Sequence, residues 1–109
     1  MVVEDEAMLS LNLETMLFDL GCVVVGTADK LDDALHMART SDFDVALLDV
    51  NLRGKRVDPV AEAIRGRGTP IVFVTGYGKT AASGLVLEKP YDAAALERML
   101  NEALGTRRQ

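Results

Sequence analysis

Short apolar runs alternate along this chain with longer segments whose apolar residues recur at helical spacing. VALL and IVFV are unbroken apolar runs, as found in strands that are covered on both faces. Between such runs, apolar residues repeat every three or four positions, which is the period of one helix face. The first of these stripes consists of Leu9, Leu13, Met16, Leu17 and Leu20. The alternation predicts a parallel sheet wrapped by helices on both faces, with right-handed crossovers.

The same pattern gives approximate bounds for the elements. Strands are predicted at residues 1–3, 22–26, 44–50, 70–74 and 85–87. A first helix is expected from about residue 6 to 20, and a second carries its apolar stripe over residues 31–38. Asp29 and Asp32 are interpreted as caps of that second helix.

Individual residues indicate where the remaining two helices begin and end. Asp58-Pro59 predicts the start of a third helix, because proline suits the first helical position, and Gly66 and Gly68 close it. Asp92 is the expected cap of the last helix.

The stretch between the last two predicted strands is too short for a full crossover. Nine residues separate Thr75 from Leu85, and three of them are glycines. Parallel crossovers normally take a dozen or more residues. We therefore expect the fourth helix to be shortened or missing, in favour of a turn or a poorly ordered segment, with an exchanged-strand dimer as the less favoured outcome.

Composition narrows the class of protein. The 109 residues, of which 49% are hydrophobic and 27% charged, suit a single folded domain over 1–109. No apolar run is long enough for a membrane helix and the start has no basic leader, so we expect a cytoplasmic protein that does not bind membranes. The net charge of −5 disfavours direct binding to nucleic acid. Cys22, the one cysteine, is expected to be a buried thiol, and His36 a surface residue.

Polar residues stand at the carboxyl ends of four of the predicted strands. Glu4 and Asp5 follow the first, Asp49 lies at the end of the third, Thr75 follows the fourth, and Lys89 comes after the fifth. In parallel sheets the carboxyl ends of the strands share one edge, where ligands bind. Three carboxylates held there repel by about 4 kcal/mol per contact at about 4 Å and an effective dielectric near 20. A hard divalent cation such as Mg²⁺ removes that penalty.

These residue types also suit phosphoryl chemistry. A carboxylate such as Asp49 can attack phosphorus to give an acyl phosphate. An ammonium group on Lys89 and a hydroxyl on Thr75 would then neutralise and hydrogen-bond the phosphoryl oxygens. Taken alone, Asp5 or Thr75 also suits the plainer role of capping the helix that follows.

Four motifs in this order, VVEDE, VALLDV, VFVTGYG and LEKPY, resemble the signatures of CheY-like receiver domains of response regulators. The resemblance implies a flavodoxin-like (βα)5 fold of strand order 2-1-3-4-5. It implies a phosphoacceptor signalling domain rather than an enzyme, in which Asp49 takes a phosphoryl group from a histidine kinase or a phosphotransfer protein.

The resemblance also implies a ligand set. Asp5 and Asp49 would hold Mg²⁺ directly, Glu4 would act largely through water, and Asn51 would offer its backbone carbonyl. The Lys89-Pro90 bond would be cis.

Two of the motifs resemble a smaller group within the receiver domains. VFVTGYG and LEKPY are similar to the FATGUY group of receivers, which are often stand-alone proteins partnered with HWE-type histidine kinases in alphaproteobacteria. Val74 stands where that motif has alanine.

One position departs from the receiver pattern. Val86 occupies the place on the fifth strand where receivers usually carry a switching aromatic residue. We therefore expect phosphorylation to change partner binding through the segment from Thr75 to Leu85, with Tyr77 or Tyr91 as the aromatic residue that moves. Tyr77 and Asn51 are also candidates for tuning hydrolysis of the phosphoryl group.

A second apolar stripe lies on the first helix, opposite its core-facing leucines. It consists of Met8, Leu11 and Phe18, and such an exposed patch often marks a binding surface. In receivers this helix docks against the kinase, so these residues are the expected kinase contact. The alternative is that Phe18 folds over the edge of the core. The downstream partner stays unidentified, and a monomer or weak homodimer is expected.

The sequence disfavours three other functions. A flavin or nucleotide binder needs a phosphate loop after the first strand, where this chain places Glu4-Asp5-Glu6. A phosphatase of the haloacid-dehalogenase kind needs a DxD motif after that strand, which is absent. A receiver that only binds proteins is disfavoured by the joint presence of Asp49, Thr75 and Lys89.

Overall fold

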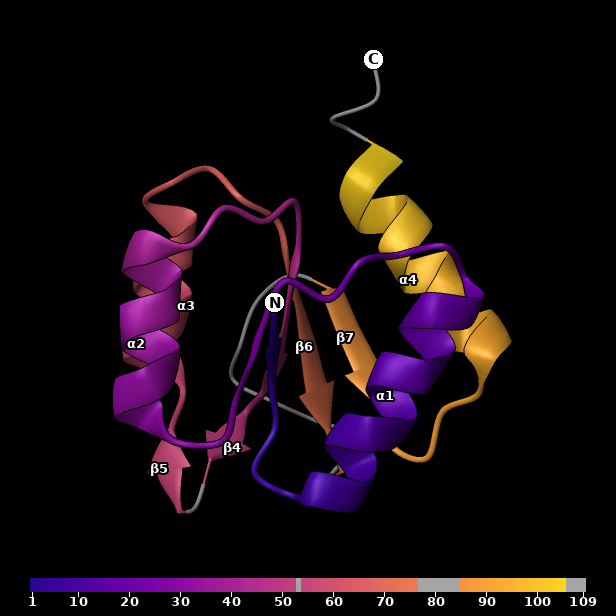
Figure 1. The fold of residues 1–109 in the computed structure, drawn as a ribbon, viewed down its shortest axis with the longest axis horizontal. Coiled ribbons are helices and arrows are strands. Elements are labelled where there is room, and N and C mark those ends of the chain that lie inside the picture. The colour runs from indigo at the N-terminus through magenta and orange to yellow at the C-terminus, as the bar shows by residue number, and fades with distance from the viewer. Residues whose placement is uncertain (53, 77–84, 106–109) are drawn as a thin grey trace.

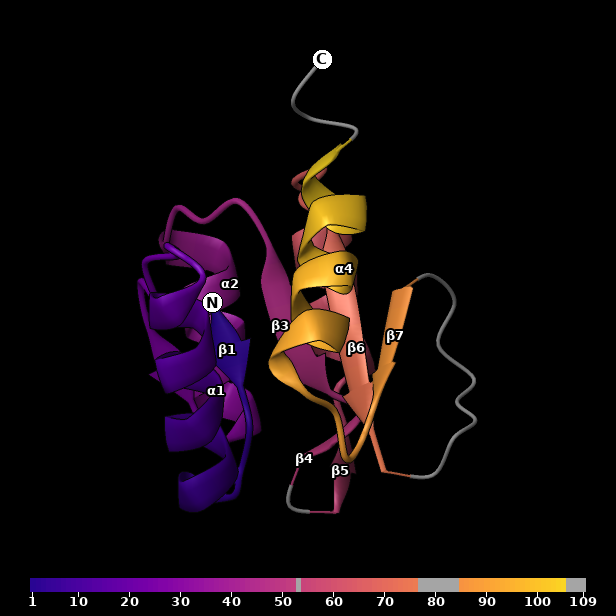
Figure 2. The ribbon, with the colours of Figure 1, turned by 90° about the vertical axis from the view of Figure 1, so that its right-hand side faces the viewer.

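The computed structural model describes residues 1–52, 54–76 and 85–105, and its centre is a five-stranded parallel sheet (Figures 1 and 2). The strand order is β2-β1-β3-β6-β7, which in order of appearance is the predicted 2-1-3-4-5. The strands are β1 (Val2–Val3), β2 (Thr27–Ala28), β3 (Ala46–Asp49), β6 (Ile71–Thr75) and β7 (Leu85–Glu88). The predicted parallel α/β sheet is confirmed.

Helices cover both faces of the sheet, with α2 and α3 on one side and α1 and α4 on the other (Figure 1). They span α1 (Ala7–Asp19), α2 (Leu31–Thr40), α3 (Asp58–Arg65) and α4 (Ala93–Gly105). Successive strand residues point to opposite faces, so Leu48 and Phe73 pack with α2 and α3, while Leu47 and Val72 pack with α1 and α4. The expected loss of a helix between β6 and β7 falls on residues 77–84, outside the described residues.

The predicted start signals of α3 and α4 are confirmed. Helix α3 begins at Asp58 with Pro59 in its first turn, and Gly66 is its C-cap. The carboxylate of Asp92 accepts a hydrogen bond from the backbone N–H of Ala95 at 2.8 Å, which caps the start of α4.

Neither Asp29 nor Asp32 occupies the N-cap position of α2. Its N-cap residue is Lys30, which makes no side-chain cap hydrogen bond in the described part of the chain. Asp32 lies inside the first turn, where a carboxylate is stabilised by the positive end of the helix dipole without capping it.

The second strand lies later than predicted. Residues 22–26 belong to no strand, although the Gly26 carbonyl accepts a hydrogen bond from the Val2 N–H, and the strand is β2, whose Thr27 and Ala28 pair with Val2 and Val3. The reason is that β1 supplies only two residues for pairing. Cys22, predicted to be buried, is therefore only half-buried.

A two-stranded antiparallel hairpin follows β3 and was not predicted. It consists of β4 (Asn51–Leu52) and β5 (Lys55–Arg56), joined through Gly54 at a φ of 81°. Glycine adopts such a positive φ without strain. Leu52 and Val57 are buried against α2 and α3, and they anchor the hairpin beside the carboxyl end of β3.

Candidate functional site

The structure brings the predicted polar residues to one edge of the sheet. Glu4 follows β1, Asp49 ends β3, Thr75 ends β6 and Lys89 follows β7. This is the edge toward which the β6 and β7 arrows point in Figure 1. Strand register enforces the arrangement, since Asp49 lies opposite Val74 on the neighbouring strand.

Three carboxylates gather at this edge. One carboxylate oxygen from each of Glu4, Asp5 and Asp49 lies within 4.8 Å of the others. Glu4 is only 5% exposed and Asp49 9%, so water screens their repulsion poorly. We call Glu4, Asp5 and Asp49 the acidic triad. The local sequence explains the density of charge, because two of the three acids are consecutive residues after β1.

Lys89 is the cation of the site. Its Nζ donates to Glu4 Oε1 at 3.1 Å and to Asp49 Oδ2 at 3.3 Å. The backbone N–H of Lys89 donates to the carbonyl of Thr75 at 2.7 Å, which ties the lysine to the end of β6. The Lys89-Pro90 bond is cis, as predicted.

The pKa values of this pair reflect burial and neighbouring charge. Burial raises the pKa of Glu4, and the charge of Asp49 adds to that rise, although hydrogen bonds from Glu6 and Lys89 work against it. Burial alone lowers the pKa of Lys89, but its hydrogen bond to Glu4 and the charge of Asp49 outweigh burial and raise it. The raised pKa of Lys89 therefore reflects its acidic neighbours, whereas the raised pKa of Glu4 reflects burial first.

A backbone contact that the sequence did not reveal holds Glu4 in place. The N–H of Glu6 donates to Glu4 Oε2 at 3.1 Å. Glu4 therefore uses one oxygen for Glu6 and the other for Lys89. A turn of the chain back onto an acid two residues earlier leaves no side-chain signature by which the sequence could reveal it.

The donor set fits a hard divalent cation. It offers carboxylate oxygens from two buried acids and one half-buried acid, and one or two carboxylates with water and phosphate is the usual environment of Mg²⁺. Asn51 begins β4 immediately beyond β3, near this edge, and the use of its backbone carbonyl as a ligand stays a prediction.

The proposed switch residues lie in different parts of the structure. Thr75 is buried at the end of β6, beside the end of β3. Val86 pairs with Phe73 and packs half-buried against the core beneath α2 and α3. Tyr91 is half-buried on the other face, where burial and then the charge of Glu4 raise its pKa. Tyr77 lies outside the described residues.

The second stripe of α1 is exposed, as predicted. Met8, Leu11 and Phe18 are between 58% and 78% exposed, so the alternative in which Phe18 folds over the core is wrong. His36 is exposed on α2, also as predicted. Contact between the stripe and a kinase stays a prediction.

The sheet order and the acidic edge define a CheY-like α/β fold. The chain belongs to the response regulator receiver domain family, whose model matches residues 1–101. No helix among the described residues is long and apolar enough to cross a membrane.

Known proteins resemble the chain in sequence and structure. It is 37% identical to SdrG from Sphingomonas melonis Fr1, with a TM-score of 0.83 over 94% of this chain and 92% of SdrG. It is 25% identical to the phyllosphere-induced regulator PhyR of Methylorubrum extorquens, over 95% of this chain but only 42% of PhyR.

A third comparison bears on the metal. The receiver domain of the sensor histidine kinase PA1611 from Pseudomonas aeruginosa PAO1 is 26% identical, with a TM-score of 0.84 over 95% of this chain and 94% of that one. That receiver holds a magnesium ion in its active-site cleft.

Proposed function

We propose that this chain is a phosphoacceptor switch of a two-component system, in which Asp49 takes a phosphoryl group from a histidine kinase or a phosphotransfer protein in a Mg²⁺-dependent reaction. The observation that carries the proposal is the position of Lys89. Its Nζ bonds both Asp49 and Glu4 inside a cluster that still has excess negative charge. The third acid leaves net negative charge that a hard cation such as Mg²⁺ would neutralise.

Each residue has a part in the transfer. A carboxylate oxygen of Asp49 attacks the phosphorus of a phosphohistidine, the new O–P bond forms, and the P–N bond breaks. The electron pair stays on the imidazole nitrogen, which then takes up a proton. The Lys89 ammonium moves from carboxylate to phosphoryl oxygen, which carries the charge after transfer, and the Thr75 hydroxyl donates to another of these oxygens.

The acidic triad is where the metal would be held. Asp5 and Asp49 would supply direct ligands, Glu4 would act largely through water, and the Asn51 carbonyl would complete the set. A bound Mg²⁺ supplies positive charge opposite the phosphoryl oxygens. Glu4 positions Lys89. Its Oε1 accepts a hydrogen bond from the lysine, while its Oε2 is held by the backbone N–H of Glu6.

The output is proposed to leave through the segment from Thr75 to Leu85. Thr75 and Lys89 are joined by a backbone hydrogen bond, so a lysine that turns toward a phosphoryl group pulls on the end of β6. Val86 has no polar or aromatic group with which to relay that motion. The tyrosines Tyr77 and Tyr91 are the proposed relays, and Tyr77 and Asn51 the proposed tuners of hydrolysis.

We also propose how the chain meets its kinase. The exposed stripe of Met8, Leu11 and Phe18 would contact apolar residues of the kinase's dimerisation helices. The likeness of VFVTGYG and LEKPY to the FATGUY group supports an HWE-type histidine kinase as the partner.

The test is chemical labelling of the acceptor. The chain is incubated with Mg²⁺ and acetyl phosphate, and intact-protein mass spectrometry is expected to show one added phosphoryl group. The gain is expected to vanish in Asp49→Ala and without Mg²⁺, while Asp19→Asn, which alters an exposed acid on α1, retains it. Beryllofluoride is expected to shift amide signals of the β6 and β7 ends in the same Asp49-dependent way. An unmodified wild type would contradict the proposal and favour a receiver that only binds proteins.

A further inference from the structure

The β4-β5 hairpin lies at the same end of the sheet as the acidic triad (Figures 1 and 2). Both residues of β5, Lys55 and Arg56, are basic and exposed. Leu52 and Val57, on either side of them in the hairpin, are buried in the core beneath α2 and α3. The two positive charges are therefore carried on a turn of the chain that the core holds in place.

A backbone hydrogen bond places Arg56 close to Asp49. The Val57 N–H, next to Arg56 in the chain, donates to the carbonyl of the residue after Asp49 at 3.2 Å. Neighbouring Cα atoms are about 3.8 Å apart and paired ones about 5.5 Å, so the Cα atoms of Asp49 and Arg56 lie within about 13 Å of each other. The Debye length is about 30 Å at 0.01 M salt. At low salt, a charge on the hairpin therefore acts on an anion at Asp49.

The two bases differ in their partners. The guanidinium of Arg56 donates to the Asp58 carboxylate, at 2.9 Å from Nε and 3.5 Å from Nη2, but both side chains are more than half exposed. Exposed ion pairs contribute little, so Arg56 can turn to another anion at small cost. Within residues 1–52, 54–76 and 85–105, Lys55 makes no ion pair at all.

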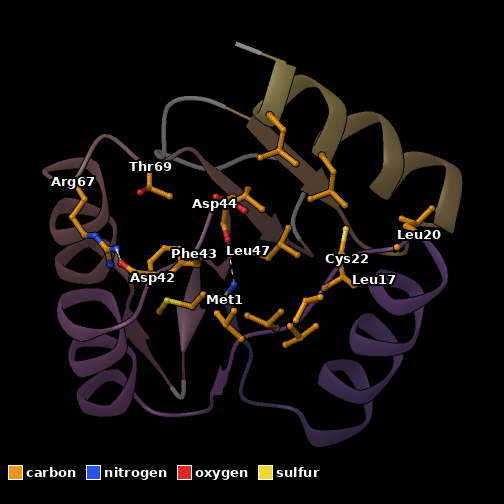
Figure 3. Close-up of a pocket in the computed structure, with 18 residues that line it drawn as sticks. Met1, Leu17, Leu20, Cys22, Asp42, Phe43, Asp44, Leu47, Arg67 and Thr69 are labelled. Carbon is orange, nitrogen blue, oxygen red and sulfur yellow. Dashed lines mark hydrogen bonds and ion pairs between the residues drawn. The ribbon is translucent and has the colours of Figure 1, made fainter. Parts of the chain in front are cut away.

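Arg67, at the amino ends of the strands, is by contrast held by structural contacts (Figure 3). Its Nη1 donates to the Ala38 carbonyl at 2.7 Å, its Nη2 lies 3.7 Å from Asp42, and its guanidinium lies 4.6 Å from the centre of the Phe43 ring. Only 28% of its side chain is exposed, against 58% for Arg56. The hairpin charges are therefore far more available to a solute.

The acidic triad itself does not attract an anion from a distance. Its three carboxylates and the Lys89 ammonium carry a net charge of −2, which a bound Mg²⁺ would bring to zero. A phosphoryl donor is negatively charged, so it approaches the site without a net attraction. Positive charge at the entrance of a site raises the local concentration of such a donor and its rate of association.

We propose that Lys55 and Arg56 attract phosphodonor anions to the acidic edge, where Asp49 takes the phosphoryl group. The inference rests on the proposed phosphoacceptor function. The attracted group is the phosphoryl anion, whether it arrives on a small acyl phosphate or on a phosphohistidine. Because the two bases act on the approach of the donor and not on the transfer step, Asp49 stays the labelled residue when they are changed.

The experiment measures the rate at which subsaturating acetyl phosphate labels Asp49 in Mg²⁺ and low salt. A unit charge about 13 Å from a doubly charged donor in water changes the local donor concentration about threefold. Lys55→Gln is therefore expected to slow labelling about threefold, and its combination with Arg56→Gln about tenfold. In about 0.5 M salt the three rates are expected to converge. Arg39→Gln, which removes an exposed charge from the last turn of α2, is the matched control and is expected to change the rate less than about 1.5-fold.

Phosphoramidate serves as a second, less charged donor. It carries the P–N bond of a phosphohistidine and less negative charge than acetyl phosphate at neutral pH, so the double variant is expected to slow it only about threefold. Equal slowing of both donors, or slowing that persists in high salt, would indicate a damaged site and overturn the inference. Unchanged rates would also overturn it and leave the two bases as ordinary exposed strand charges. Labelling of Asp49 in these cases still supports the proposed function, whereas an unlabelled wild type contradicts that function itself.

Discussion

Lys89 and Asp49 are 40 residues apart in the chain, yet Nζ of the lysine lies 3.3 Å from Oδ2 of the aspartate. The contact exists because β3 and β7 flank β6 in parallel and end at the same edge. Glu4 joins from β1 at 3.1 Å from the same Nζ, so three segments distant in sequence meet at one ammonium group. The charge balance of this edge, three acids to one lysine, governs how the protein responds to substitution, pH and Mg²⁺.

Removal of the lysine charge is expected to destabilise the fold. Lys89→Met leaves Glu4 and Asp49 as buried acids without their cation, at a cost of about 2 kcal/mol of unfolding free energy. Mg²⁺ is expected to restore part of this loss, because it neutralises the same oxygens. Urea unfolding with and without Mg²⁺ measures both effects. Lys30→Met, at an exposed position, is the matched control, and equal losses in the two variants would refute the role of the contact.

The raised pKa of Glu4 gives a pH dependence of defined sign. The folded state holds the proton of Glu4 more tightly than the unfolded state, whose pKa is near 4.5. The contribution of Glu4 to stability is therefore fully present below pH 4.5 and is lost as pH rises through the folded pKa. Mg²⁺ competes with the same proton, so its affinity is expected to weaken as pH falls through that range.

Glu4→Gln separates these effects. The variant is expected to lose less stability than the wild type as pH rises from 4.5 in the absence of Mg²⁺, since it has no carboxyl group to ionise there. The Mg²⁺ affinity of the variant is expected to be lower than that of the wild type and to change less with pH. Denaturation and Mg²⁺ titration across a pH series test both, and parallel curves for variant and wild type would contradict the assignment. Glu14→Gln, on α1 away from the acidic triad, controls for the change in net charge.

The hairpin after β3 supplies a stability test of a feature that the sequence did not reveal. Leu52 is 1% exposed and packs beneath α2 and α3, so Leu52→Ala is expected to cost about 3 kcal/mol. Lys55→Ala, on the exposed strand of the same hairpin, is expected to change stability by less than about 0.5 kcal/mol. Chemical denaturation of the two variants gives both numbers, and similar values would show that the hairpin is not anchored through Leu52.

The sequence was most informative where burial and chemistry coincide. Apolar runs that end in an acid, a threonine or a lysine placed Asp49, Thr75 and Lys89 at one edge, because parallel topology aligns the strand ends. The proline at 59 and the capping Asp92 marked helix starts through local backbone chemistry, which needs no tertiary information.

The features that the sequence predicted wrongly or did not reveal depend on tertiary context. The segment 22–26 has the composition of a strand. Which residues pair with β1 depends on the length of β1, and the residues of segment 22–26 do not encode that length. The hairpin depends on Leu52 and Val57 finding the core, and the Glu6 contact depends on the path of the backbone. Asp29 and Asp32 have the right residue type for a cap but the wrong position in the helix start.

The exposed stripe of α1 leads to the prediction that separates kinase docking from acceptor chemistry. Leu11 is 58% exposed and does not belong to the acidic triad, so Leu11→Glu is expected to leave acetyl phosphate labelling of Asp49 unchanged. Phosphotransfer from the cognate histidine kinase is expected to slow about tenfold, because a charge would enter an apolar interface. Asn12→Glu adds the same charge at the next exposed position of α1 and is expected to have a smaller effect. Radiolabel transfer kinetics from the phosphorylated kinase distinguish the two variants. If they slow transfer equally, net charge on α1 governs the encounter, and the apolar contact through Leu11 is refuted.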